Sequence, residues 1–412
     1  MTLGWGKMQY FDKLSMTGGT YQHPSDRVIG AGPSDWSHLG GINKSTPVRL
    51  RRPGRHQQIN VSTHQPPCFP LPSLPLKMKP IQEIFPLLSS PKKIVITTHQ
   101  KPDADAMGSS LALTHFLRQF GHEVTVISPT NWAAFLNWMP GCKEVIDYER
   151  NVEKSKKILN EAAWLFCLDF NALHRTKRME DVLTKLTCVK ILIDHHIEPQ
   201  VAEFDYGYSL TSKSSTCEMI YDVIVESGHD DKITESIAEC LYAGAMTDTG
   251  SFRFASANET VHLMVADLKR RGLKHSQVHE NIYDNFLENR LRFIGNMLLN
   301  RMEIFYEYNT ALIAISKQDL LRYEMKTGDT EGLVNYPLSI QGIKLAALVI
   351  DRDEERKWSF RSKGNFDCNT FARTYFEGGG HFNAAGGRSS DSLDQTVAKF
   401  KRVMKENEKL LQ

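Results

Sequence analysis

Acidic and histidine side chains recur where buried strands should end, and this pattern constrains the fold more than any other feature of the chain. Three short apolar runs, at 94–96, 164–168 and 189–193, have the character of buried strands. In an open parallel sheet the carboxyl ends of the strands share one edge, where ligands bind. The polar residues that follow these runs, or that end the apolar run 237–246, are therefore expected to meet in one pocket. They are His99, Asp103, Asp105, Asp169, Asp194, His195, His196 and Asp248.

Strand-like and helix-like stretches alternate through most of the chain. The alternation predicts an α/β fold with a doubly wound, mainly parallel sheet and helices on both faces. A smaller α+β domain should follow, with the active site in the cleft between the two domains. Strands are expected at 92–99, 123–128, 163–169, 189–194, 311–316, 344–351 and 357–362. Helices are expected at 108–119, 214–228, 233–247, 258–272, 288–306 (running into a strand), 369–376 and 392–411.

The chain divides into four predicted segments. Residues 1–77 hold nine of the 17 prolines, and nine Lys and Arg against three Asp and Glu, without a hydrophobic period. We expect a disordered or spurious N-terminal extension there, with a basic partner-binding arm as the alternative. The first domain is predicted at 78–285, a connector helix at 286–305 and the second domain at 306–412.

Composition argues against several classes of protein. No stretch approaches the roughly 20 apolar residues that span a bilayer, and the N-terminus lacks the apolar core of a secretory signal. The seven cysteines form no CxxC pair, which argues against a zinc ribbon or a disulfide framework. Beyond residue 77 the chain is mildly acidic and offers no long basic track for nucleic acid. We therefore expect a cytoplasmic protein without membrane attachment.

The segment 99–109 carries the first acids. Asp103 and Asp105 lie two residues apart in a predicted strand-to-helix loop, within reach of His99 at the strand end. Gly108 and Ser109 are expected to open the helix, where free N–H groups favour a bound anion. Mixed carboxylate and imidazole ligands suit Mn²⁺, and also Fe, Co or Zn. The simpler alternative is an N-capping aspartate beside a loop histidine.

Asp194, His195 and His196 are harder to explain as ordinary loop residues. An acid and two imidazoles at the end of a buried strand would be costly to bury without partners. Because alternate side chains of a strand point to opposite faces, the two histidines should have different roles. Asp169 repeats the pattern at its own strand end, and Asp248 does so in a glycine-containing turn. Together these residues predict a phosphoesterase that uses a pair of divalent ions.

Four motifs, in order along the chain, resemble those of the DHH phosphoesterase superfamily. They are His99-x-x-x-Asp103-x-Asp105-Ala-x-Gly-Ser, Asp169, Asp194-His195-His196 and Thr247-Asp248-Thr249-Gly250. The runs at 214–218 and 251–254 are similar to the nanoRNase and pAp-phosphatase branch of that superfamily. The resemblance extends over about residues 80–400.

The resemblance implies a role for each residue of these motifs. The ligands of one divalent ion would be His99, Asp103 and Asp169. Those of the second would be Asp105, Asp169, His195 and Asp248, so that Asp169 bridges the pair. His196 would face the phosphate or assist in catalysis, and Asp194 would orient the motif from behind. Mn²⁺ is the expected ion, with Co²⁺, Fe²⁺ or Mg²⁺ as alternatives.

A glycine-rich run at 378–387 is similar to the motif of the DHH-associated domain, which usually follows the DHH domain and closes over the site. Small residues let a phosphate or sugar approach the backbone closely, although a flexible turn is the alternative. Arg361, at a predicted strand end, can bind a phosphate bidentately. Glu377 departs from the motif, because many relatives carry glycine there. The expected substrate-binding residues are Arg361, Ser362, Gly379, Gly380, His381 and Asn383.

The resemblance implies a hydrolase of short substrates. It would cleave short oligoribonucleotides and linear dinucleotides to mononucleotides, and convert 3′-phosphoadenosine 5′-phosphate to AMP. No additional oligonucleotide-binding domain is evident, which weakens a RecJ-like processive exonuclease, and the second domain favours nucleotides over pyrophosphate. A cyclic-dinucleotide phosphodiesterase and a nucleotide-binding sensor without turnover stay open as alternatives. A homodimer is also left open.

Overall fold

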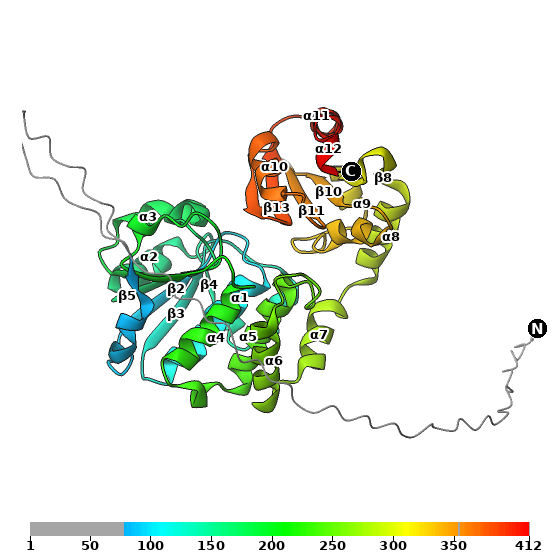
Figure 1. Ribbon diagram of the computed structural model, residues 1–412. Helices are drawn as coiled ribbons and strands as arrows, with labels where there is room; N and C mark the ends of the chain where they lie inside the picture. Colours follow the sequence, from blue (N-terminus) through cyan, green and yellow to red (C-terminus); the bar gives the residue numbers. More distant parts are fainter. Residues whose placement is uncertain (1–77, 353–354, 412) are drawn as a thin grey trace, which may run out of the picture. The chain divides into compact units, whose positions relative to one another are not determined.

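The computed structural model describes residues 78–352 and 355–411, so the expectations for residues 1–77 fall outside the described residues. The first domain is built on a seven-stranded sheet in the order β1-β7-β6-β5-β2-β3-β4 (Figure 1). Every neighbouring pair is parallel, as the sequence predicts. The strands are β1 (Lys79–Pro80), β2 (Lys93–Thr97), β3 (Glu123–Ser128), β4 (Ile146–Asp147), β5 (Trp164–Leu168), β6 (Val189–Asp194) and β7 (Tyr206–Ser209).

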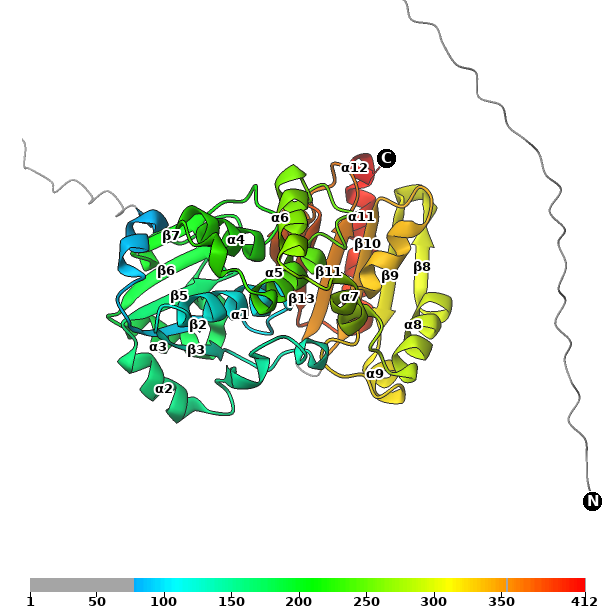
Figure 2. The same ribbon diagram turned by 90° about the horizontal axis from the view of Figure 1, so that it is seen from below.

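Helices cover both faces of this sheet, because its central strands are apolar on both sides. One face carries α1 (Ala104–Arg118), α4 (Thr216–Glu226) and α5 (Glu235–Asp248), which lie side by side in Figures 1 and 2. The other face carries α2 (Val152–Glu161) and α3 (Glu180–Lys185). Ile96 of β2 packs in the cluster that contains Phe116 of α1, whereas Val95 packs with Leu159 of α2. The sheet is therefore buried on both sides, and its carboxyl edge is left to hold a site.

Three helices lead from the first sheet to the second. They are α6 (Glu259–Arg270), α7 (His275–Tyr283) and α8 (Glu288–Asn300). Helix α8 falls in the predicted connector, and the strand that follows it, β8 (Met302–Phe305), pairs antiparallel with β9 (Thr310–Ile315) in the second sheet. The segment boundaries given above stay predictions.

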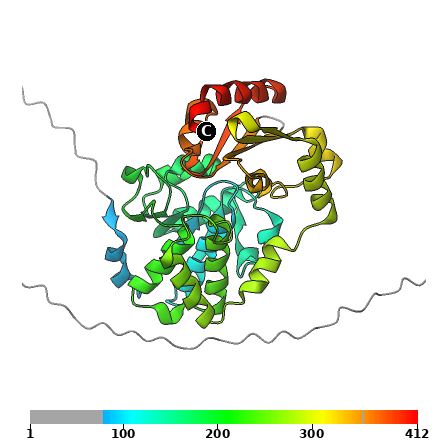
Figure 3. The same cartoon turned by 45° about the vertical axis from the view of Figure 1, so that its right-hand side comes forward.

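The second domain is a six-stranded mixed sheet in the order β12-β13-β11-β10-β9-β8. Its further strands are β10 (Leu345–Asp351), β11 (Arg356–Ser362), β12 (Gly379–His381) and β13 (Ala384–Ser389). One face packs against α8 and α9 (Lys317–Arg322), and the other against α10 (Cys368–Tyr375) and α11 (Leu393–Glu406), the latter in red in Figure 3. Trp358 and Phe360 of β11 stack with Phe400 of α11. A last short helix, α12 (Glu408–Leu411), follows.

Three local expectations need correction. Helix α1 begins at Ala104, because the Asp103 carboxylate accepts hydrogen bonds from the N–H groups of Asp105 and Ala106 and so caps it. Gly108 and Ser109 therefore lie inside the helix and do not offer an anion site at its start. Asp248 is the last residue of α5 and does not lie in a turn.

The glycine run also differs from a flexible turn, because it forms β12 and β13 at the edge of the second sheet. Glycine is needed there for close approach. A Cβ atom on Gly387 would lie 2.7 Å from the Phe376 carbonyl oxygen. Glu377, where many relatives carry glycine, has a positive φ of 44°, a conformation that glycine adopts most easily. Within the described ranges no helix is both long and apolar enough to cross a membrane.

Candidate metal centre

The fold brings all eight predicted acids and histidines of the first domain to one edge of the sheet. Strands β6, β5 and β2 are neighbours, and each ends just before part of the cluster. His99 follows β2, Asp169 follows β5, and Asp194 is the last residue of β6. Asp103 and Asp105 lie at the start of α1, and Asp248 ends α5. Helices α1 and α5 thus deliver carboxylates to the same point as the strands.

His99, Asp103 and Asp169 form the first group. One potential ligand atom from each lies within 4.8 Å of the others. The Nδ1 atom of His99 lies 2.8 Å from the carbonyl oxygen of Gln100, which can only accept, so Nδ1 carries the proton. Nε2 is then the atom that faces Asp169, 3.4 Å from its Oδ2. Asp103 is both an N-cap and a member of this group, since the capping bonds use only its Oδ1.

Asp105, His195 and Asp248 form the second group, again with ligand atoms within 4.8 Å of one another. The Nδ1 atom of His195 contacts the Lys213 carbonyl oxygen at 3.3 Å, which fixes the proton there. Nε2 lies 3.4 Å from Asp169 Oδ1, 3.5 Å from Asp248 Oδ2 and 3.9 Å from Asp105 Oδ2. This nitrogen is buried and has no hydrogen-bond partner among the described residues. A nitrogen surrounded by acids but not hydrogen-bonded to them has the placement of a metal ligand.

Asp169 stands between the two groups. Its Oδ2 faces His99 and its Oδ1 faces His195, and the residue is 2% exposed. Its backbone has a positive φ of 64°, which aspartate tolerates better than most residues. Residues held in such a sparsely populated backbone conformation cluster at active sites and ligand-binding sites. The two oxygens of one carboxylate thus face His99 and His195 separately.

The acids of the cluster disfavour one another's ionised forms. Burial opposes ionisation of Asp169, but close contacts with His195 and His99 hold its pKa well below the usual range. Burial, and then the neighbouring Asp169, raise the pKa of Asp105 to about 7. Burial, Asp105 and Asp103 raise the pKa of Asp248 well above its usual range. The carboxylates therefore repel one another, and a divalent cation would relieve that repulsion. The donor set fits a metal centre.

Asp194, which the resemblance predicts to orient the motif, contacts His196. The two are hydrogen-bonded at 2.7 Å, with Nδ1 of His196 donating to Asp194 Oδ1. His381 of β12 joins them from the second domain, with ring centroids 4.8 Å from His195 and 4.7 Å from His196. Burial, and then His196 and His195, lower the pKa of His381 to about 3, so this ring is neutral at pH 7.

The remaining predicted substrate residues lie on or beside β11, β12 and β13. Arg361 forms no ion pair with any described residue. Burial lowers its pKa, an effect that Cys368, Asp248 and Asp103 oppose. Ser362 and Asn383 are already engaged, since Asn383 Nδ2 donates to Ser362 Oγ at 2.8 Å and to the Gly364 carbonyl.

Gly379 and Gly380 form the edge strand, where the Gly380 N–H donates to Asn369 Oδ1. Their contacts to substrate, like those of the other second-domain residues, stay predictions.

Residues 213–218 contact several acids and histidines of the site, and of these residues only 214–218 carried a family resemblance in the sequence. The N–H groups of Thr216 and Cys217 donate to Asp105 Oδ2 and Oδ1 at 2.6 and 2.9 Å. The Thr216 hydroxyl donates to Asp169 Oδ1 at 3.0 Å. Backbone amides at the start of α4 thus hold one acid and a side chain holds another. Backbone contacts of this kind, between residues more than 100 positions apart, leave no pattern in the sequence.

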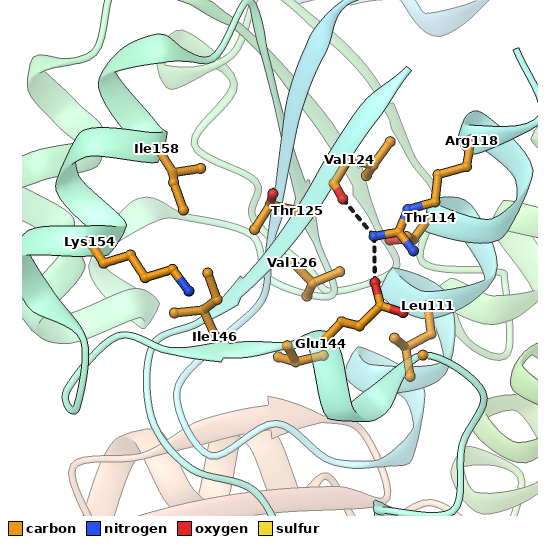
Figure 4. Close-up of a pocket in the computed structure, with 12 residues that line it drawn as sticks. Leu111, Thr114, Arg118, Val124, Thr125, Val126, Glu144, Ile146, Lys154 and Ile158 are labelled. Carbon is orange, nitrogen blue, oxygen red and sulfur yellow. Dashed lines mark hydrogen bonds and ion pairs between the residues drawn. The ribbon is translucent and has the colours of Figure 1, made fainter. Parts of the chain in front are cut away.

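A cavity of about 230 Å³ lies elsewhere in the first domain, between α1, α2, β3 and β4 (Figure 4). Arg118 and Glu144 on its lining form an ion pair at 2.8 Å, and Arg118 also donates to the Val124 carbonyl. None of the predicted site residues lines this cavity. It is therefore separate from the acid and histidine cluster.

The crossing of α1 and α5 predicts a sensitive position at Gly244. A Cβ atom there would lie 2.7 Å from Asp105 Oδ1 and 2.8 Å from Asp105 Cα. We expect Gly244→Ala to lower the free energy of unfolding by about 1–3 kcal/mol through overpacking, and to displace Asp105. Gly295→Ala, also inside a helix, is the matched control, because its Cβ would meet nothing within 4 Å. Urea unfolding of both variants checks this, and equal stabilities would contradict it.

Two family descriptions match successive parts of the chain. Residues 93–245 match the DHH family, N-terminal domain, and residues 310–406 match the DHHA1 domain. The two matches correspond to the two sheets.

The sequence similarity to two named relatives covers most of the chain. The chain is 28% identical over 332 residues to a bifunctional oligoribonuclease and PAP phosphatase NrnA of Bacillus subtilis, covering 79% of this chain and 99% of that protein. It is likewise 28% identical to the protein of the same name from Thermus thermophilus, over 80% and 94% of the two chains.

A solved structure agrees with the fold described above. An exopolyphosphatase-related protein from Bacteroides fragilis has a TM-score of 0.76 and 37% identity, covering 80% of this chain and 97% of that one. Since both domains match in order and this relative is similar across almost its whole length, the chain belongs to the DHH family of metal-dependent phosphoesterases, with a DHHA1 domain following the DHH domain.

Proposed function

We propose that this protein is a two-metal phosphohydrolase that cleaves short oligoribonucleotides and linear dinucleotides to mononucleotides. We also propose that it dephosphorylates 3′-phosphoadenosine 5′-phosphate to AMP. The observation that carries the proposal is the placement of Asp169, whose two oxygens face two separate groups of acid and histidine ligands. The names of the Bacillus and Thermus relatives support the choice of substrates.

The two groups have the ligands that a pair of divalent ions needs. His99, Asp103 and Asp169 would hold one ion, and Asp105, Asp169, His195 and Asp248 the other. When bound, such ions would neutralise phosphoryl oxygens and lower the pKa of an attacking water. Mn²⁺ is the proposed ion, because carboxylates mixed with imidazoles suit it better than they suit Mg²⁺.

The other side chains would orient the substrate and handle its charge. His196, held by Asp194, would present its other ring nitrogen to the phosphate. Neutral His381 can donate one hydrogen bond to a phosphate oxygen without adding a charge beside His195 and His196. Arg361, with Ser362, Gly379, Gly380 and Asn383 around the β12–β13 hairpin, would bind the rest of the nucleotide. A cytoplasmic location belongs to the same proposal and agrees with the six free cysteines among the described residues.

A panel of substrates tests the function. Turnover with Mn²⁺ would be measured on 3′-phosphoadenosine 5′-phosphate, linear pApA, a five-nucleotide RNA, a 24-nucleotide RNA, cyclic di-AMP and pyrophosphate. Rapid cleavage of the first three and slow cleavage of the others is expected. Cleavage of cyclic di-AMP or pyrophosphate alone would keep the metal centre and overturn the substrate. Binding of Mn²⁺ without turnover on any of the six would favour a nucleotide-binding sensor.

Arg361→Ala should weaken substrate binding more than it slows turnover. A charged hydrogen bond contributes about 1.5–3 kcal/mol, so we expect KM to rise by about 10- to 150-fold. Arg361→Lys is the matched control, because it keeps the charge but not the bidentate geometry. Its KM should lie between the KM of the wild type and that of Arg361→Ala. Steady-state kinetics on linear pApA would measure both constants. An unchanged KM in Arg361→Ala would count against the phosphate contact.

A further inference from the structure

The segment 213–218 contacts three of the four predicted ligands of the second ion. The Lys213 carbonyl contacts His195, the N–H groups of Thr216 and Cys217 hold Asp105, and the Thr216 hydroxyl donates to Asp169. The segment leads from β7 into α4 and is not itself a strand. Its position therefore depends on what anchors it.

Glu218 is the anchor. Its side chain is 1% exposed, and its Oε2 accepts from the Ser214 N–H at 2.8 Å. Its Oε1 lies 3.0 Å from Lys213 Nζ and accepts from the Thr260 hydroxyl at 2.7 Å. Burial opposes its ionisation, but hydrogen bonds from Ser214, Thr260 and Lys213 lower its pKa, so the carboxylate is charged. A buried charge with three donors holds a fixed place.

We propose that Glu218 is a positioning residue for the second ion: by clamping Lys213 and Ser214 it sets the carbonyl that orients His195 and the start of the helix that holds Asp105. The inference rests on the proposed two-metal centre and names a residue outside the ligand set that governs its affinity. Partners of metal ligands often tune affinity in this way, because they fix the tautomer and direction of the ligand.

Helix capping alone would be a simpler role for Glu218, and metal affinity separates the two. Glu218→Gln keeps the size of the side chain but replaces one carboxylate oxygen by an NH₂ group, which cannot accept a hydrogen bond from the donors on that side. Capping predicts only a lower Tm. Positioning predicts that one of the two Mn²⁺ binding steps weakens by about 10- to 100-fold, the cost typical for partners of metal ligands.

Asp222→Asn is the matched control. Asp222 also pairs with Lys213 Nζ, at 2.7 Å, and accepts from the Tyr208 hydroxyl, but it does not contact the backbone of the clamped segment. This variant tests whether losing an ion pair to the Lys213 side chain is enough to weaken Mn²⁺ binding. We expect its Mn²⁺ affinity to equal that of the wild type.

The experiment is a titration of the metal-free full chain with Mn²⁺ alone, with free Mn²⁺ followed by electron paramagnetic resonance and Tm recorded alongside. Weakened binding in Glu218→Gln, with Asp222→Asn unchanged, is the expected result. Wild-type binding in Glu218→Gln, or equal weakening in both variants, would overturn the inference. Should Glu218→Gln fail to fold, the isosteric Thr260→Val, which removes one of its donors, replaces it under the same criteria. If the wild type itself binds no Mn²⁺, the proposed function fails first.

Discussion

Replacing Asp169 with asparagine is expected to lower kcat by more than about 100-fold, since even the outer partners of metal ligands cost about 10- to 100-fold when changed. The Asp169 carboxylate turns one oxygen to His99 of the first ligand group and the other to His195 of the second. Asparagine keeps the shape of the side chain and tolerates the positive φ of 64° at this position. Alanine would add about 1–2 kcal/mol of backbone strain, so the effect of that strain could not be separated from the effect of losing the carboxylate. The Asp169→Asn variant would therefore test the loss of the charge and of one carboxylate oxygen without backbone strain, through steady-state turnover on 3′-phosphoadenosine 5′-phosphate.

Asp147→Asn is the control for the Asp169 change. Asp147 also ends a strand of the same sheet and is 9% exposed, but its carboxylate accepts from the Glu149 N–H and pairs with Arg150, away from the cluster. Its kcat should stay near the wild-type value. Near-normal turnover in folded Asp169→Asn protein, judged by circular dichroism, would refute the bridging role.

The layers of the first domain follow directly from its apolar runs. Residues 164–168 are apolar throughout and form a strand buried on both faces, which is what a central parallel strand requires. The positions of Asp169 and Asp194 could be predicted from the same runs, because the carboxyl ends of all strands in a parallel sheet lie at the same edge. The motif at 194–196 also predicts different surroundings for its two histidines, because neighbouring side chains of a strand point to opposite faces. In the structure His195 faces the acids, whereas His196 is hydrogen-bonded to Asp194.

The sequence left the start of helix α1 open between two alternatives, and it gave no sign of the long-range contacts. Helix α1 begins at Ala104 because Asp103 caps it, although Gly108 is the more conspicuous residue. The glycine run becomes two paired strands because its small residues allow a close approach to the Phe376 backbone. The contact between Glu218 and Ser214 is local and could be inferred, but the effect of this clamp on His195 depends on a backbone carbonyl, and any residue type carries one.

Removing divalent ions is expected to abolish turnover and to lower Tm, and Mn²⁺ should restore both. Without a cation, the buried Asp105 and the half-buried Asp248 lie beside other acids, and the pKa of each is raised because its ionised form is disfavoured. A ligand that binds only the folded state stabilises it by about 2.7 kcal/mol at a hundredfold excess over Kd. Differential scanning calorimetry after dialysis against a chelator, with and without added Mn²⁺, measures this effect.

The stabilisation by Mn²⁺ should depend on the cluster and not on general ion binding at the surface. Asp169→Asn removes the charge shared by both ligand groups, so its Tm should respond far less to Mn²⁺ than the Tm of Asp147→Asn. Each variant is compared with itself, so a difference in their metal-free stabilities does not affect the result. Full turnover after chelation, or an equal rise in Tm in the two variants, would mean that the acids at the strand ends do not hold the ions on which activity depends.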